Sequence, residues 1–97
     1  MSKPPPIAVL TLELHIAAAQ SLKDRRQVVA SIRDRVKARF NVAVAEVGDT
    51  EKWQSATLAI CTVGNDRRHL ERELRTILAA IEDWQLADVV RQRIEFL

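Results

Sequence analysis

Glu13 and His15 are the two side chains whose types and spacing suit acid–base chemistry. They stand two residues apart in a stretch of alternating polarity, so an extended strand places both on one face. A carboxylate beside an imidazole can transfer a proton near neutral pH. No nucleophile, glycine-rich phosphate loop or second histidine at metal-ligand spacing accompanies them. We therefore predict no catalytic residue, metal ligand or cofactor, and keep a small enzyme or metabolite-binding domain using this face as the alternative function.

A second set of residues has the chemistry to bind anions. Residues 21–40 carry seven basic side chains against two acidic ones, within a chain whose net charge is only +2. Cations at the start of a helix oppose its macrodipole, and a bound phosphate would relieve that repulsion. Two other interpretations stay open: Arg25 and Arg26 pair with acids such as Glu13 or Glu46, or the charges are simply solvated. The predicted anion- or RNA-binding residues are Ser21, Lys23, Arg25, Arg26, Arg33 and Lys37.

Helical periodicity places the basic residues of segment 21–40 on different sides of the predicted helix. At 100° per residue, Arg25 falls close to the middle of the apolar stripe, whereas Arg35 and Arg39 lie along one border. The opposite border carries Lys23, Arg26, Arg33 and Lys37. Such a border has the form of a surface that follows a nucleic-acid backbone, although charges beside an amphipathic helix are also common on an ordinary wet surface.

The elements that would position these residues follow from period and turn signals. Alternation predicts a strand over 7–16, and Ser21 is a helix cap with Asp24 as the acidic member of a capping box. The helix ends before Asn41. Further signals predict strands over 42–47 and 56–63, a helix around 70–81 and an edge strand over 86–97. The expected core comprises Leu10, Leu12, Leu14, Val29, Ile32, Val36, Leu70, Leu74, Ile77 and Ile81.

The order β-α-β-β-α-β predicts an α+β fold of the ferredoxin-like type. Right-handed crossovers give an antiparallel four-stranded sheet with both helices on one face and the first and third strands in the centre. Residues 1–6, with three prolines, are expected to be a flexible N-terminal extension, and residues 7–97 a single ferredoxin-like domain. Trp53 and Trp84 are expected to anchor polar loops on the core.

The open face of the predicted sheet has no aromatic platform on which bases could stack. This leaves phosphate or shape recognition by the first helix as the nucleic-acid hypothesis. The apolar content of the open face also predicts a homodimer formed through the open sheet face or an edge strand. The expected open-face positions are Ile7, Val9, Thr11, Glu13, His15, Thr57, Ala59, Cys61 and Val63.

The cysteine content and the lack of long apolar stretches bear on where the protein is located in the cell. The single cysteine, Cys61, permits no intrachain disulfide and fits a reducing cytoplasm. No stretch resembles a signal peptide or approaches the roughly 20 apolar residues that span a bilayer. We expect a cytoplasmic protein that does not enter a membrane, in which Cys61 packs without reacting.

Four stretches of the sequence carry a resemblance to a known family: Leu12-Glu13-Leu14-His15-Ile16, Ser21-Leu22-Lys23-Asp24-Arg25-Arg26, residues 39–47 and Trp53-Gln54-Ser55-Ala56-Thr57-Leu58. They resemble the YlxP-like family of bacterial proteins, a family of unknown function. The resemblance implies a ferredoxin-like fold and genes beside those for translation initiation and ribosome maturation, but no established activity. This chain differs from the family at Ala17-Ala18-Ala19, where the family commonly has a Pro-Gly turn, and in its proline-bearing extension.

The basic helix and this implied genomic context favour one function over the alternative. We predict an RNA- or ribosome-associated binding module that acts through the basic helix, with structured RNA or a ribosomal particle as its partner.

Overall fold

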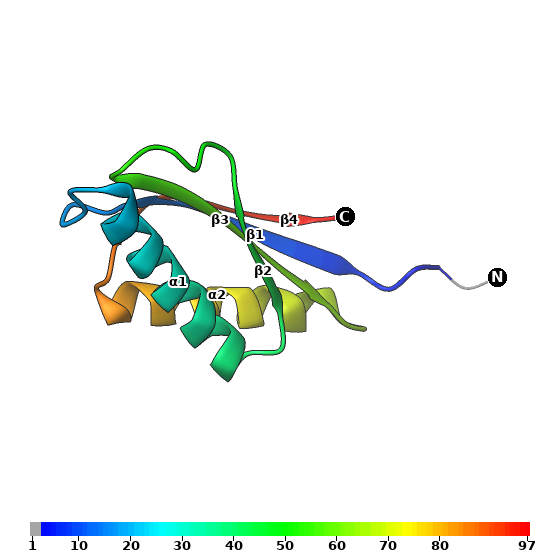
Figure 1. Cartoon of the computed structure of the whole chain (residues 1–97). Helices are drawn as coiled ribbons and strands as arrows, with labels where there is room; N and C mark the ends of the chain where they lie inside the picture. The colour runs from blue at the N-terminus through cyan, green and yellow to red at the C-terminus, as the bar shows by residue number, and fades with distance from the viewer. Residues whose placement is uncertain (1–2) are drawn as a thin grey trace.

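The computed structural model describes residues 3–97, which form one sheet covered by two helices (Figure 1). The predicted β-α-β-β-α-β order is confirmed. Met1 and Ser2, part of the predicted extension, lie outside the described residues. The elements are β1 (Ile7–His15), α1 (Leu22–Arg39), β2 (Ala43–Val47), β3 (Ser55–Val63), α2 (Arg67–Trp84) and β4 (Asp88–Phe96).

The four strands form an antiparallel sheet in the order β2-β3-β1-β4. The first and third strands are therefore central, as predicted, and both helices lie against the same face (Figure 1). Each helix connects two strands across an intervening one, which is the expected ferredoxin-like arrangement.

The core lies between this sheet face and the helices. Burial alternates along β1 and β3, because successive side chains of a strand point to opposite faces. All ten residues predicted from the sequence to form the core are at most 4% exposed. The pattern of apolar residues was therefore sufficient to identify the inner faces of β1, α1 and α2.

The helix ends have identifiable causes. Ser21 caps α1 with its side chain, and Asp66 does the same for α2. At its other end α1 stops at Phe40, whose backbone is extended. Helix α2 stops at Gln85, which adopts the left-handed conformation with φ of 55°. The final strand consequently begins at Asp88 and not at Leu86, because Leu86 and Ala87 follow this turn and pack partly against the core.

Two local features differ from expectation. Trp84 packs against the core as predicted, but the corresponding prediction for Trp53 is wrong, since that side chain is 55% exposed. Strand β4 also contains a bulge: Glu13 is opposite Arg91 and Leu14 is opposite Val89, so Val90 has no partner on β1. Within the described residues neither helix is long and apolar enough to cross a bilayer.

Candidate functional site

The first turn of α1 is closed by side chains of the protein itself. The backbone N–H of Asp24 donates to Ser21 Oγ at 3.1 Å, as the predicted cap requires. The Asp24 carboxylate accepts from the backbone N–H of Gln20, also at 3.1 Å, so the box reaches one residue beyond the cap. A carboxylate thus already lies at the positive end of the helix, and Ser21 serves as a structural cap.

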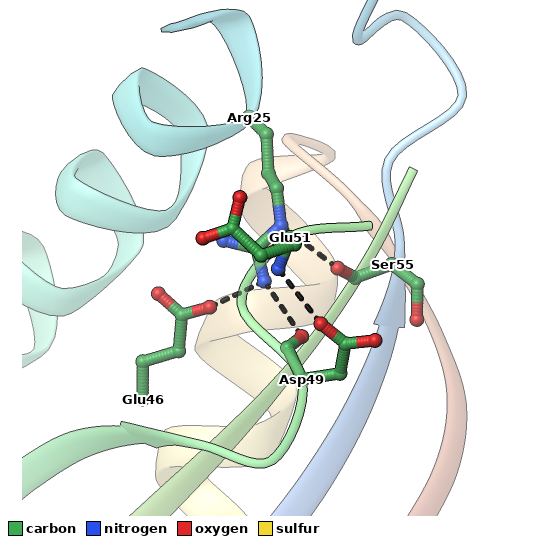
Figure 2. Close-up of polar contacts among 5 residues, drawn as sticks. All are labelled: Arg25, Glu46, Asp49, Glu51 and Ser55. Atoms are coloured by element: carbon green, nitrogen blue, oxygen red, sulfur yellow. Dashed lines mark hydrogen bonds and ion pairs between the residues drawn. The ribbon is translucent and has the colours of Figure 1, made fainter. Parts of the chain in front are cut away.

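Arg25 points away from solvent and is 1% exposed (Figure 2). Its Nε donates to the carbonyl oxygen of Ser55 at 3.0 Å. Its Nη2 donates to the Glu46 carboxylate and, at 3.4 Å, to the carbonyl oxygen of Asp49. The planar guanidinium therefore ties the start of α1 to the end of β2, the β2–β3 loop and the start of β3.

The burial of Arg25 decides between the two interpretations left open by the sequence. Its position in the apolar stripe of α1 directs it under the helix, where Glu46 neutralises it. These internal partners give Arg25 a structural role at this end of the molecule. Its part in anion binding stays a prediction.

The remaining predicted cations form an exposed row on α1, here called the outer row: Lys23, Arg26, Arg33 and Lys37. Arg33 Nε is 3.1 Å from Asp34 Oδ1, and this pair is well exposed to solvent. The other three make no ion pair with any described residue. From Lys23 to Lys37 the row spans 14 helical rises, about 21 Å at 1.5 Å per rise.

The opposite border of α1 is occupied within the molecule. The guanidinium carbons of Arg35 and Arg39 lie 5.6 Å and 5.9 Å from the centre of the Trp84 ring. Arg39 also lies 5.6 Å from the Phe40 ring. These cation–π contacts place this border against α2. The outer row consequently faces away from α2, and the helix presents its unpaired cations on one side only.

Glu13 and His15 lie two residues apart on the open face of β1 and line different hollows. The Glu13 carboxylate pairs with Arg91, with 3.0 Å between Oε2 and Nε, and lines a shallow hollow with Thr11 and Arg93. His15 lines a different hollow, at the end of β1, with Glu82 and Asp88. Among residues 3–97 no three His, Cys, Asp or Glu side chains are grouped to hold a metal ion. Cys61 is a half-buried free thiol on the open face.

A further basic cluster was not assigned a role from the sequence. Arg67, Arg68 and Arg72 surround a hollow beside Phe96, with Glu71 among them. Arg67 lies 4.6 Å from the centre of the Phe96 ring. The one-turn spacing of Arg68 and Arg72 was a visible signal, but only the tertiary structure brings the carboxyl-terminal strand beside them.

The fold and these surfaces define a small ferredoxin-like domain with a cation-bearing helix and an open sheet face. The chain belongs to the family described as a protein of unknown function, DUF503, whose model matches residues 7–94. It is 38% identical over 72 residues to the uncharacterised protein YlxP of Bacillus subtilis (strain 168). That alignment covers 74% of this chain and 78% of the relative. The resemblance found in the sequence is thus confirmed, and neither description names an activity.

Proposed function

We propose that this protein is an RNA-binding module that contacts structured RNA through the outer row of α1. The observation that carries the proposal is the unequal use of the cations on this helix. Arg25 is neutralised inside the protein, and Arg35 and Arg39 lie over Trp84. Lys23, Arg26 and Lys37 stay exposed and without an acidic partner among the described residues.

Structured RNA suits this surface better than unpaired bases. The row is linear and cationic, which fits the spaced phosphates of a folded RNA backbone. The central strands β1 and β3 carry no Phe, Tyr or Trp, so the open face lacks a platform of aromatic rings on which successive bases could stack. A ribosomal particle is the proposed source of this RNA, because the family resemblance implies genes of ribosome maturation as neighbours. The partner would be met in the cytoplasm.

The alternative function, a small enzyme or metabolite-binding domain using the Glu13/His15 face, has less support than RNA binding. Glu13 and His15 share the open face of β1 but line different hollows. Glu13 is also engaged by Arg91.

RNA binding is tested by titrating a labelled ribosomal RNA hairpin at several salt concentrations. If about four phosphates are neutralised, the logarithm of affinity should fall with the logarithm of salt concentration at a slope of roughly −3 to −4. The double variant Arg26→Glu and Arg33→Glu should bind more weakly at every salt concentration, with a slope shallower by roughly 2. Both side chains are exposed, so its circular dichroism and melting should match those of the parent.

The matched control reverses two exposed arginines on α2, Arg68 and Arg72, to glutamate. This control should bind nearly as well as the parent. Equal losses in the two double variants would mean a general attraction between charges and would refute the outer row as the site. Absence of binding at about 50 mM salt, both to the hairpin and to ribosomal subunits in co-sedimentation, would end the RNA proposal altogether.

A further inference from the structure

Strand β4 leaves one long edge of the sheet without a partner. It stands last in the order β2-β3-β1-β4, so only one of its edges is hydrogen-bonded, to β1. Its nine residues make it longer than β2, the edge strand on the other side, which has five. A row of free N–H and C=O groups on a long edge is a template for pairing with another strand.

The direction of the free backbone groups follows from one hydrogen bond at the end of β4. The N–H of Leu97 donates to the carbonyl oxygen of Ile7 at 2.9 Å, so residue 97 points its backbone groups toward β1. These groups alternate along an antiparallel strand, and residues 93 and 95 therefore also point inward. Residues 92, 94 and 96 point their N–H and C=O groups outward, where a new strand would bind.

The charged side chains of β4 complement those of a second, antiparallel copy of the same strand. Arg93 and Glu95 both lie on the open face, opposite Thr11 and Val9 of β1, and are 68% and 50% exposed. Their own contact is an intrachain pair, with 3.1 Å between Arg93 Nε and Glu95 Oε1. In an antiparallel pair of identical strands centred on Ile94, each Arg93 stands opposite Glu95 of the second copy. The same register sets Ile94 opposite Ile94 and Gln92 opposite Phe96.

We infer that β4 pairs antiparallel with β4 of a second copy of this chain, about a twofold axis at Ile94. This register uses the outward-pointing groups of residues 92, 94 and 96, as a hydrogen-bonded antiparallel ladder requires. It places opposite charges across the axis twice and like charges nowhere in the paired segment 91–97. The two sheets become one continuous sheet of eight strands. This inference does not rest on the proposed RNA binding.

Other surfaces are less suited to a second copy. Pairing through β2 offers five residues and lies on the side of the sheet that α1 covers, so two outer rows of cations would approach each other. On β4 itself the bulge at Val90 interrupts the strand, but it lies outside residues 91–97. On the helix face Arg67, Arg68 and Arg72 outnumber Glu71 beside Phe96, so this face adds no attraction. The attraction across the axis comes from the backbone hydrogen bonds and the open-face charges.

Sedimentation equilibrium of the full chain tests the dimer. At tens of micromolar the mass should be twice the monomer mass of 11.0 kDa. Arg93→Glu places the new carboxylate of each copy opposite Glu95 of the other copy, on both sides of the axis. This repulsion should raise the dissociation constant roughly tenfold. Glu95→Arg should do the same with two cations. The combined swap, Arg93→Glu with Glu95→Arg, should restore the parent dissociation constant.

Arg91→Glu is the matched control, because Arg91 lies on the same face but opposite Leu97 in this register. It should change the dissociation constant little. A protein that sediments as a monomer up to about 100 µM overturns the inference, as does a combined swap that fails to dimerise. Dissociation by Ala45→Lys, on the open face of β2, with no effect of Arg93→Glu, would assign the interface to the sheet face instead.

Oxidative cross-linking tests the register itself. With Cys61 replaced by alanine, Ile94→Cys sets two thiols across the axis, where Cα atoms of a hydrogen-bonded pair are about 5.5 Å apart and within disulfide range. Air oxidation should give a covalent dimer. The control Gln92→Cys, whose opposite residue is Phe96, should not cross-link. Cross-linking by Gln92→Cys but not by Ile94→Cys would show a shifted register and refute the axis at Ile94.

Discussion

The residue type of Arg25 does not by itself define its role, because an arginine can either bind an external anion or form a buried ion pair, depending on its neighbours. Next to Lys23 and Arg26 in the sequence it belongs to a basic cluster, but its helical position turns it toward the core. There the Glu46 carboxylate and two carbonyl oxygens, of Asp49 and Ser55, satisfy it. A buried charge is tolerated only with such partners, so the guanidinium and its acceptors depend on one another.

Removal of Arg25 should therefore destabilise the domain. Arg25→Ala leaves Glu46 without its partner, two carbonyl groups without a donor and a space beneath α1, and we expect a loss of about 3 kcal/mol in the free energy of unfolding. The measurement is urea denaturation. Arg26→Ala, at the adjacent exposed position, should change it by no more than about 0.5 kcal/mol. Similar effects of the two substitutions would contradict the structural role of Arg25.

The two helices show what an element contributes beyond its residues. In α1, one border contacts Trp84 of α2 through Arg35 and Arg39, and the other presents the outer row to solvent. The same cations would have no distinct sides in an isolated helix. In α2, the end of the helix is decided by Gln85, whose φ of 55° is a conformation that glycine adopts more readily.

Gln85→Gly should accordingly stabilise the protein. Relief of the left-handed conformation exceeds the extra entropy that glycine loses on folding, and we expect a gain of about 0.5 kcal/mol in thermal or urea unfolding. Gln27→Gly, at an exposed position within α1, is the matched control and should cost roughly 1 kcal/mol. A destabilised Gln85→Gly variant would show that the glutamine side chain, and not its backbone conformation, matters at this turn.

At the scale of the whole molecule, one buried layer holds all six elements together. Sheet and helices contribute apolar side chains to a single cluster that includes Leu12 and Ile32, both 0% exposed. The opposite sheet face is left open, with Thr11 only partly covered. The residues that stabilise the fold are thus separate from the surfaces proposed to bind partners. The inner face maintains the fold, while the outer row, the open face and the edge of β4 are exposed.

Truncation of the core tests this separation. Leu12→Ala and Ile32→Ala each remove packed side-chain atoms and should lower the free energy of unfolding by about 2–5 kcal/mol. Thr11→Ala, one residue along β1 on the open face, should cost less than about 1 kcal/mol. Chemical denaturation followed by tryptophan fluorescence would measure all three. Losses below about 0.5 kcal/mol at both Leu12 and Ile32 would refute the assigned faces.

The sequence by itself determined the order of the elements, the inner faces of the two helices and the two central strands, and the Ser21 cap. These features depend on period and on contacts between residues close in the chain, such as Asp24 with Ser21. The family could also be recognised, since 38% identity extends over most of the chain. The ferredoxin-like topology followed because few chain paths satisfy the rules for strand connections.

Only the tertiary structure decided how the side chains are used. The partners of Arg25 lie at Glu46 and Ser55, far along the chain, and no local pattern specifies which acid meets which base. The ion pair of Glu13 with Arg91, the exposure of Trp53 and the border of α1 that meets Trp84 likewise depend on which elements lie side by side. Periodicity fixes the direction in which a side chain leaves its own element, whereas its partner belongs to another element placed by the packing of the whole core.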